Sequence, residues 1–357
     1  MHCFFFGGFM KKVLVAVLLT AMIIGNAAAL EVDFYDLPAA WAADFATIED
    51  QLREKIDEKY GKYEEGEKLN KGIGNANALA ADGGYMRTAN GYDWINVAVS
   101  INSGVAMDGG SIWKFNDDFI DKFEDKGDLY MGAGLQLITA SIGFNLGHLL
   151  KWDHGLYITL KGGVGKIESG DLDFDSYNLG FMVNYQLLEA KNLGNGKILK
   201  WRGLNVGTGL NYYSSTLKWT INHLEPVDVN QGGEKFTYDT DLDVKSEISR
   251  FIIPVEINTG IKLTVLELFG GLGADFMFGG DNEVSVNSVA EVTRTNSDEV
   301  GHAKMKMSKD GDLDTVKFRY TVGLGFSLGP VRLEIPYTQY FGEDFTGSIG
   351  VIGGVAF

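Results

Sequence analysis

The sequence predicts an all-β transmembrane barrel of about ten antiparallel strands, about fourteen at most, preceded by an amino-terminal amphipathic α-helical segment. Three observations carry this prediction: segments of alternating apolar and polar residues, connections that alternate between long and short, and a closing stretch that ends on Phe357. The 47 Gly and 5 Pro suit closely packed strands better than a disordered chain. The formal net charge of -17 disfavours nucleic acid as a partner.

The amino end reads as a secretory signal. Lys11 and Lys12 precede an apolar run from Val13 to Ile24, and Ala27 to Ala29 offer a cleavage site. The run is too short for a membrane-spanning helix, which needs about 20 residues, so a membrane protein of this sequence must cross the bilayer with strands. Cys3 is the only cysteine and lies in this segment, so we expect the mature chain to have no disulfide and no lipid anchor.

The chain divides into three expected regions. Residues 1–29 are the signal peptide, of which residues 1–9 can lie upstream of the true start. Residues 30–91 form a helical, hatch-like periplasmic segment, and residues 92–357 form the barrel in the bacterial outer membrane, with the lipid bilayer as its surroundings.

An amphipathic helix is expected to begin at Pro38, a residue that suits a first helical turn. Apolar residues recur every three or four positions, at Trp41, Phe45, Ile48, Leu52, Ile56, Tyr60 and Tyr63. The stripe predicts packing on the periplasmic mouth of the barrel or on another helix, and the alternative is a plug or a partner-docking element. A stretch of small residues from Gly72 to Tyr85 then leads toward the first strand.

Ten segments show the alternation of a strand with one apolar and one polar face. They are residues 95–101, 129–146, 156–164, 177–185, 204–212, 251–257, 266–278, 316–326, 331–337 and 345–357. In the second segment the apolar parity switches between Leu137 and Ile138, which predicts a bulge or an extension above the membrane. An even number of strands is what a closed single-chain barrel of this kind requires.

The connections are sorted by length. Those after the odd segments are mostly long and acidic, at residues 106–128, 166–175, 220–244 and 279–312, with a short one at 341–344. Those after the even segments are mostly short, at Trp152 to Gly155, Lys191 to Gly196, Thr259-Gly260 and Gly329-Pro330. A barrel with both ends in the periplasm places long loops outside and tight turns inside, whereas a soluble sandwich has no reason to sort its loops.

Charged residues on the polar parity are expected to face the lumen. They are Lys161, Arg250, Glu256, Glu267, Asp275, Lys317, Arg319, Arg332 and Glu334. Arg202 is counted with this inward set, although strict parity would point it outward near the rim. A ten-stranded barrel is narrow and its interior is usually filled by side chains, which favours a salt-bridged interior. A polar permeation path is the alternative.

The closing stretch presents Phe345, Ile349, Val351, Val355 and Phe357 on one side of a strand. It resembles the last strand of bacterial outer-membrane barrels, and the resemblance implies an assembly signal that the barrel-assembly machinery reads. We expect this strand to close the barrel against residues 95–101.

The order of a signal, a helical segment and an acidic barrel resembles the long-chain fatty-acid transporter family and related spirochaetal surface proteins, some of them matrix-binding adhesins. That family has a small-residue hatch with an acidic pair and Asn-Pro-Ala. Here Asp82 and Ala89-Asn90-Gly91 occur without the pair and without the proline. The resemblance implies passive uptake or carriage of small, fatty-acid-like hydrophobic molecules. The alternative is an adhesin or interaction protein whose acidic outer loops bind a host matrix protein while the barrel is its anchor.

Two runs of alternate aspartates, Asp171, Asp173 and Asp175, then Asp239, Asp241 and Asp243, offer the oxygen ligands that calcium accepts. Ser176 and Val244 stand where an EF-hand loop needs glycine, so solvated loop charge is the simpler reading. His223 and His302 lie in outer connections without a recognisable motif, and the chain has no Gly-x-Ser-x-Gly and no nucleotide-binding loop. We therefore expect no enzymatic activity, no cofactor and no resident metal.

Overall fold

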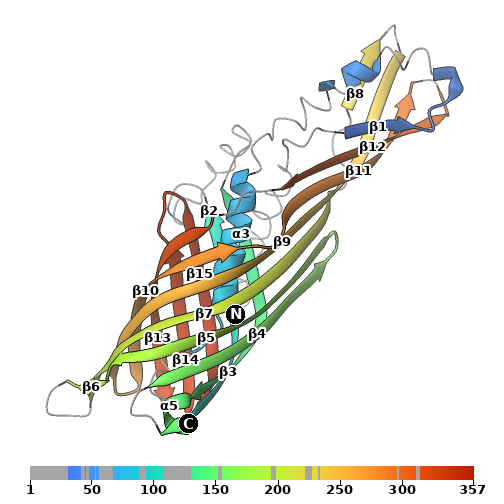
Figure 1. Cartoon of the computed structure of the whole chain (residues 1–357). Helices are drawn as coiled ribbons and strands as arrows, with labels where there is room; N and C mark the ends of the chain where they lie inside the picture. Colours follow the sequence, from blue (N-terminus) through green and yellow to red (C-terminus); the bar gives the residue numbers. More distant parts are fainter. Residues whose placement is uncertain are drawn as a thin grey trace.

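The computed structural model forms one continuous antiparallel sheet that closes into a barrel and extends beyond it at one end (Figure 1). The structure describes residues 31–41, 45, 48–52, 54–55, 67–87, 94–107, 130–151, 155–193, 198–221, 227–231, 234–295, 297–310 and 314–357. The expected signal peptide, most of the 106–128 connection and the Ala89-Asn90-Gly91 stretch lie outside these residues.

Ten strands make the ring, each antiparallel to its neighbours. In ring order they are β2 (Ile95–Met107), β3 (Met131–Asn145), β4 (Leu156–Ser169), β5 (Leu172–Leu188), β7 (Leu199–Ile221), β9 (Glu234–Leu263), β10 (Leu266–Phe278), β13 (Val316–Leu328), β14 (Val331–Tyr340) and β15 (Phe345–Ala356). Pairing of β7 with β9 and of β15 with β2 closes the ring. The expected all-β barrel of about ten strands is confirmed.

The barrel has its apolar residues outside and its polar residues inside. On β2, the side chains of Val97, Val99 and Ile101 are 44%, 52% and 55% exposed, whereas Asn96 and Ser100 between them are buried. A soluble sheet would place these side chains the other way round. An exposed apolar wall around a ring with no free strand edge is the structure that hydrocarbon demands, because backbone polar groups find no partner there except each other.

Two expectations about register are confirmed. The pairing of β2 with β3 shifts between Ser100 and Asn102, opposite the point where the apolar parity switches at Leu137 and Ile138. The last strand closes on the first along its whole length, from Phe345 opposite Met107 to Ala356 opposite Asn96. Each parity signal in the sequence therefore corresponds to a specific pairing.

We call the end of the barrel that holds Phe357 and the short turns the inner end, and the opposite end the outer end (Figure 1). At the inner end lie α5 (Leu146–Leu150), β6 (Lys191–Asn192) and the turn at Gly329, whose φ is +59°. The prediction of a turn at Thr259-Gly260 is wrong. β9 continues to Leu263 because Ile261 and Leu263 extend its outward apolar parity, and the chain reverses at Thr264, whose φ is 56°.

The acidic outer connections at 166–175, 220–244 and 279–312 are largely strands within the described residues, which corrects the expectation of long loops there. Residues 166–175 form a tight hairpin between β4 and β5, turning at Gly170 with φ +59°. The 220–244 and 279–312 connections contribute β8 (Val227–Gln231), β11 (Asn282–Arg294), β12 (Val300–Asp310) and the first half of β9. Acidic residues occupy the solvent-exposed face of these strands. Because acidic residues are also common in loops, the sequence had suggested loops in these segments.

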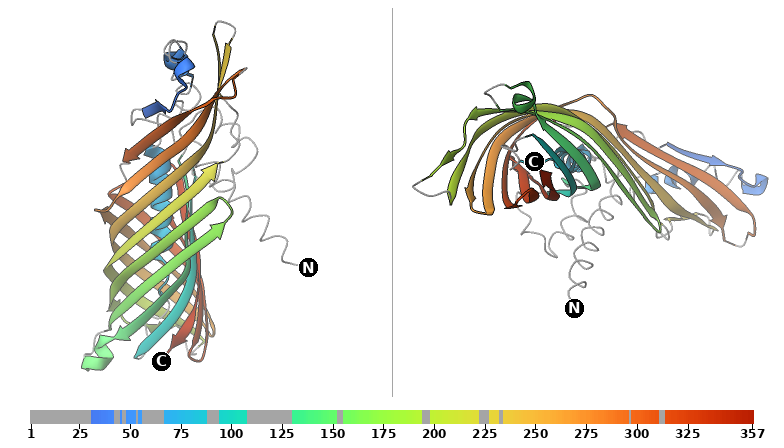
Figure 2. Two further views of the ribbon diagram at one scale, coloured as in Figure 1. Left: turned by 90° about the vertical axis from the view of Figure 1, so that its right-hand side faces the viewer. Right: turned by 90° about the horizontal axis from the view of Figure 1, so that it is seen from below.

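These strands form a second structure beyond the outer rim, which we call the extension sheet (Figure 2). Its strand order is β8, β9, β11, β12 and β1 (Glu31–Tyr35), with β9 passing from the barrel into the extension. Gly279 and Gly280, with φ of +63° and +83°, take the chain from β10 into β11. A Cβ on Gly280 would overlap the backbone of Ser249, so only glycine fits this close passage.

The amino-terminal apolar stripe covers one face of the extension sheet. After η1 (Ala39–Trp41), the side chains of Trp41, Phe45, Ile48 and Leu52 are at most 3% exposed and pack in one core with strand residues such as Phe236. Ring centroids of Trp41 and Phe236 lie 5.8 Å apart in an edge-to-face arrangement. The stripe therefore packs at the outer end and not against a periplasmic mouth. Ile56, Tyr60 and Tyr63 lie outside the described residues.

The small-residue stretch forms α3 (Glu67–Asp82), which stands inside the barrel (Figure 1). From Asn75 to Asp82 no side chain is more than 1% exposed. The helix runs from the outer end toward the inner end of the barrel, which is the end where β2 begins. No helix among the described residues is long and apolar enough to cross a membrane.

The packing of the stripe generates a test. We expect Trp41→Ala to free residues 31–55 from the extension sheet, because removing a buried Trp side chain costs about 3–5 kcal/mol. Limited proteolysis should then cleave this segment faster, while the heat-modifiable gel migration of the barrel is retained. Asp50→Ala, at an exposed position of the same segment, serves as the control. Equal cleavage of both variants would contradict the packing described.

Candidate functional site

The lumen is lined by polar side chains and contains α3, so it is the part of the molecule where function must be sought first. On β3 the side chains of Gln136, Thr139 and Ser141 are at most 4% exposed, and on β7 those of Asn205 and Asn211 are at most 1% exposed. Amide and hydroxyl groups are costly to bury unless they find hydrogen-bond partners. Such a wall suits water and polar groups and offers little to a hydrocarbon chain.

Glycines on the wall let α3 lie directly against the sheet. A Cβ at Gly134 of β3 would come within 2.5 Å of Asn77 Cα, and Cβ atoms at Gly104 and Gly132 would come closer still to backbone atoms of α3. No side chain fits between helix and strands at these positions. The small residues of α3 and the glycines of β2 and β3 are therefore two halves of one contact, which we call the glycine seat.

Lys161 of β4 holds the carboxyl end of α3. Its Nζ donates hydrogen bonds to the carbonyl oxygens of Ala81 at 2.8 Å, Asp82 at 2.7 Å and Gly83 at 3.1 Å. An ammonium group has three donors, and the last carbonyls of a helix are unpaired acceptors at the negative end of its dipole. The buried lysine thus finds its compensation in the helix itself.

A guanidinium group joins α3 to three strands. Arg319 of β13 donates through Nε to Asp275 Oδ1 at 2.9 Å and lies with Nη2 at 3.1 Å from Glu256 and 3.2 Å from Asp82. Asp82 also pairs with Arg87 at 3.2 Å. All five side chains are nearly completely buried. We call this set the Arg319 clasp, and because breaking a buried ion pair leaves an uncompensated charge, it fixes the position of the helix end.

Neutral donors complete the clasp. The Tyr85 hydroxyl donates to Glu256 at 2.6 Å, and the Tyr340 hydroxyl donates to Asp275 at 2.7 Å. The Arg87 guanidinium lies over the Tyr85 ring, 4.5 Å from its centroid. Each buried carboxylate therefore has several donors, which is the condition under which charges are tolerated away from water.

The outer part of α3 has a separate attachment. Asn75 donates to the Tyr130 hydroxyl at 2.8 Å and to Asp314 at 3.0 Å, and Lys317 pairs with Asp314 at 2.9 Å. Burial would raise the pKa of Asp314, but the hydrogen bonds from Asn75 and Lys317 outweigh it and hold this pKa below its ordinary value. Asp314 thus stays ionised at the rim and ties the helix to the start of β13.

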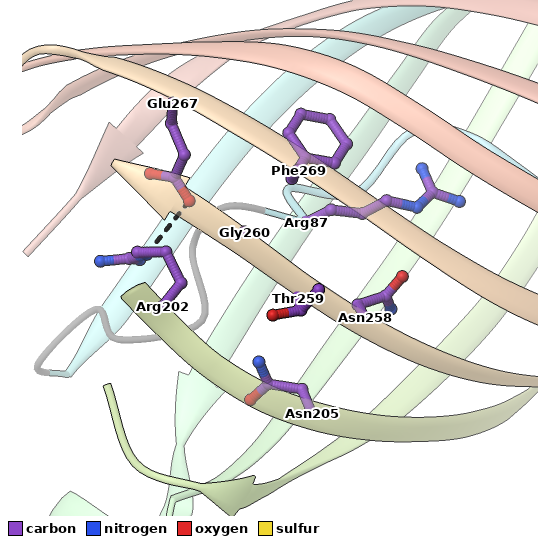
Figure 3. A pocket seen from close by; sticks show the side chains of 8 residues that line it. All are labelled: Arg87, Arg202, Asn205, Asn258, Thr259, Gly260, Glu267 and Phe269. Atoms are coloured by element: carbon purple, nitrogen blue, oxygen red, sulfur yellow. Dashed lines mark ion pairs between the residues drawn. The ribbon is translucent and has the colours of Figure 1, made fainter. Parts of the chain in front are cut away.

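Below the clasp, near the inner end, lies a small cavity (Figure 3). Its volume is about 10 Å³, room for about one water molecule. Side chains from β7, β9, β10 and the segment after α3 line it: Arg87, Arg202, Asn205, Asn258, Thr259, Glu267 and Phe269, together with Gly260. Figure 3 shows the ion pair between Arg202 and Glu267 at its edge, with Nε and Oε1 3.1 Å apart.

Arg202 lies on the lumen side, although strict strand parity would point it outward. The pairing of β7 with β9 shifts between Trp201 and Leu204, and Gly203 has a φ of +82°. A bulge of this kind turns the following or preceding side chain to the other face. Arg202 therefore reaches Glu267 instead of lipid, with only 12% of its side chain exposed.

The structure places the expected lumen charges in two groups. Those nearly fully buried are Lys161, Glu256, Glu267, Asp275, Arg319 and Glu334, and those half-buried near the rims are Arg250, Lys317 and Arg332. The clasp brings together Glu256, Asp275 and Arg319, and Glu334 accepts the Arg87 backbone N–H at 2.8 Å. Sequence reasoning missed Tyr85, Arg87 and Tyr340, although polar residues flanking a small-residue helix were a usable signal.

The residues of the expected assembly signal do not all face outward. Ile349, Val351 and Phe357 are 53%, 49% and 59% exposed, and Val355 is partly exposed. Phe345 is only 5% exposed because its ring lies over Gly347. The apolar face of this strand is therefore shorter than the sequence suggested.

The two aspartate runs lie in strands, except for Asp171, which lies in the turn before β5. Asp239, Asp241 and Asp243 point to the exposed face of β9, and Asp173 and Asp175 lie on β5, just after Asp171 in the turn. Same-face residues of a strand are about 6.6 Å apart along the chain, too far for a compact oxygen cage. Within the described residues, no group of three or more His, Cys, Asp or Glu side chains is placed to hold a metal ion.

Comparisons with known proteins place the chain in a family. A family model described as Lsa36-like matches residues 27–355, nearly the whole chain. A search for similar curated sequences returns no match.

Solved structures with some likeness include the translocator domain of the autotransporter NalP from Neisseria meningitidis, with 10% identity, a TM-score of 0.30 and coverage of 89% of this chain and 98% of that one. The CymD monoaromatic hydrocarbon channel has 9% identity, a TM-score of 0.27 and coverage of 82% and 97%. The outer membrane protease OmpT from Escherichia coli has 13% identity, a TM-score of 0.29 and coverage of 75% and 98%. Likeness at this level carries no argument about function.

The glycine seat generates a test of occlusion. We expect Gly134→Val to displace α3, because a Cβ at this position would lie 2.5 Å from the Cα of Asn77, which is backbone of the helix. Conductance across planar bilayers should then rise well above that of the unchanged protein. Gly353→Val is the matched control, since a Cβ at Gly353 meets nothing within 4 Å. If neither variant conducts more than the unchanged protein, the position of α3 does not depend on this contact.

The clasp generates a second test. Arg319→Met should lower the free energy that holds α3 in the lumen by about 3–5 kcal/mol, because several buried carboxylates lose their shared cation. Faster amide exchange in residues 73–82, with heat-modifiable migration retained, is the expected readout. Lys166→Met removes an exposed pair with Glu168 and should change nothing. If both variants exchange alike, the clasp does not hold the helix.

Proposed function

The chain belongs to the Lsa36-like family, and we propose that this member is a non-catalytic surface-contact protein: the barrel anchors it in the outer membrane, and the extension sheet meets a partner outside the cell. The observation that carries the proposal is the contrast between the two ends of the same strands. Inside the membrane they surround a filled lumen, and beyond the rim they form an ordered structure with a core of its own.

The filled lumen argues against a conduit as the resting state. α3 is buried from Gly72 to Asp82, seated on glycines and held at its inner end by Lys161 and the Arg319 clasp. The cavity at the inner end has room for about one water molecule. A solute the size of a fatty acid has no path past these groups while α3 is in place.

The extension sheet is built like a recognition module. Its core combines strand residues such as Phe236 and Tyr238 with the amino-terminal stripe that includes Trp41 and Phe45. A core of this size keeps the sheet ordered, and ordered surfaces bind with a lower entropic cost than mobile loops. Residues 227–248 and 282–310 carry more acidic than basic side chains, which suits a partner with a basic surface.

Passage of small solutes is the second candidate function. It is favoured by one observation: several buried polar atoms of the lumen wall, among them Gln136 Oε1, Thr139 Oγ1 and Ser141 Oγ, have no hydrogen-bond partner among the described protein groups. Displacement of α3 would let water reach them. The solutes admitted would be small and polar rather than fatty-acid-like, because the wall is polar.

Removal of the outer hairpin tests the proposal. A variant in which a short turn joins Gly279 to Asp314 lacks β11 and β12 but keeps all ten ring strands and the contact of Asp314 with α3. We expect it to reach the outer membrane and keep its heat-modifiable migration, yet to lose binding to immobilised matrix proteins of basic isoelectric point by at least about tenfold. The unchanged protein should bind these probes less tightly as salt rises.

The control shortens the β4–β5 hairpin around Gly170, which lies at the same end but outside the extension sheet. Its binding should equal that of the unchanged protein. If the β11–β12 deletion leaves binding intact, or if the unchanged protein conducts freely in planar bilayers and binds no surface probe, the surface-contact proposal fails and solute passage takes its place.

A further inference from the structure

The inner mouth of the lumen concentrates positive charge in a chain whose net charge is -17. Lys200 and Arg202 lie near the start of β7, Lys262 near the end of β9, and Arg332 near the start of β14, all beside inner turns. The positive charge of Lys262 is repelled by the positive charges of Arg332, Arg202 and Lys200. We call these four residues the basic cluster.

The carboxylates nearby do not balance this charge. Glu267 interacts with Arg202, Lys262 and Arg332 at once, and its hydrogen-bonded partner is Arg202. Glu334 acts on Arg332 but already accepts the backbone N–H of Arg87. Among the described residues, Glu267 and Glu334 are thus the carboxylates that act on these four cations.

Backbone register forces two of these cations together. Lys200 is paired directly opposite Lys262 on the neighbouring strand. Like charges directly opposite each other in a sheet destabilise it. A sheet that keeps such a pair, beside two arginines, carries an electrostatic cost that an anion would remove.

The small cavity lies behind the basic cluster and offers donors of its own. Arg87, which is 5% exposed, lines it, and its Nε finds no hydrogen-bond acceptor among the described groups. Asn258 also lines it, with its amide donating to Glu256 at 2.7 Å. An N–H group buried without an acceptor is rare in folded proteins, and it points to a missing partner that accepts.

We propose that the basic cluster binds an oxyanion, the phosphate or carboxylate group of a small water-soluble solute, that enters the lumen from the inner side of the membrane. Guanidinium groups bind such oxygens through paired, charge-assisted hydrogen bonds. A mouth lined by one sign of charge within walls of low dielectric constant also raises the local concentration of the opposite ion.

The direction of the side chains favours a solute over a lipid headgroup. Lys262 stands between Ile261 and Leu263, which are 45% and 50% exposed on the outer face, so strand alternation turns the lysine inward. Arg332 is placed in the same way between Val331 and Leu333. The cations therefore face the lumen and not the surrounding bilayer. This site is independent of the surface contact proposed above.

Direct binding measurements test the proposal. The full-length protein, folded in a detergent without phosphate groups, is dialysed against labelled inorganic phosphate and pyrophosphate. We expect saturable binding that weakens with salt and that falls by at least about tenfold in the double variant Lys262→Gln, Arg332→Gln. Lys166→Gln, which removes an exposed lysine from the β4–β5 hairpin at the outer end, should bind as the unchanged protein does.

A second readout separates binding from a structural role. Without added anion, Lys200→Gln should raise the temperature of the heat-modifiable transition, because it relieves the repulsion across β7 and β9. Pyrophosphate should raise this temperature in the unchanged protein and have little effect on Lys200→Gln. Lys262→Arg keeps the charge and should keep the binding, which guards against variants that fail to fold.

Three results would overturn the proposal. The first is the absence of binding at pyrophosphate concentrations up to the millimolar range. The second is equal binding of phosphate and pyrophosphate by the double variant and by Lys166→Gln. The third is a rise in the temperature of the heat-modifiable transition with anionic phospholipid vesicles but not with pyrophosphate. The last result would assign the cations to the bilayer surface instead of the lumen.

Discussion

The structure depends on one constraint: within the hydrocarbon layer, every backbone N–H and C=O group must be paired inside the protein. The pairing of β15 with β2 and of β7 with β9 meets this constraint by leaving no strand edge in the ring. Closure fixes the direction of every side chain, because alternate residues must then face either lipid or lumen. The apolar wall and the polar interior follow from this geometry and need no further cause.

A closed ring of ten strands creates a second constraint, because its interior is too wide for strand side chains that are mostly Asn, Ser, Thr and Gly to fill. Large side chains from the wall are one solution in narrow barrels. Here a helix of small residues enters instead, and Gly104, Gly132 and Gly134 let its backbone lie against the strands. Such a contact has little hydrophobic area, so Lys161 and Arg319 supply the attachment that packing alone would not. The charges of the lumen are therefore mainly the means by which the helix is held.

The sequence predicted those features that follow from strand alternation. Parity located every ring strand, the bulge opposite Leu137 and Ile138, the strand that closes against the carboxy terminus, and the inward charges. It failed where two physical effects give the same pattern. Acidic alternation in residues 234–248 fits a loop as well as the solvent face of a strand, and its other face is apolar only because the distant stripe at Trp41 and Phe45 covers it.

Other features depend on single backbone conformations. Arg202 faces the lumen because Gly203 and a register shift turn the strand there, and parity counts have no means of anticipating such a shift. The clasp was visible only in part, because Asp82, Tyr85 and Arg87 lie about 170 to 250 residues from Arg319, Glu256 and Glu334, which they contact. Contacts at such separations depend on the closed ring and not on any local pattern.

The amino-terminal segment takes part in both functions considered for this chain. It covers the extension sheet at residues 31–55 and fills the lumen at residues 67–87. A partner outside the cell that competed for the apolar face of the sheet would release only the first attachment. The glycine seat, Lys161 and the Arg319 clasp would still hold α3, because they share no residue with that face and distant contacts contribute nearly independently. A ligand shifts an equilibrium only by its differential affinity for the two states, and a partner bound to the sheet touches none of the groups that hold the helix. Contact at the surface therefore leaves the barrel shut, whereas a ligand that reached the lumen from the inner mouth would meet the clasp directly.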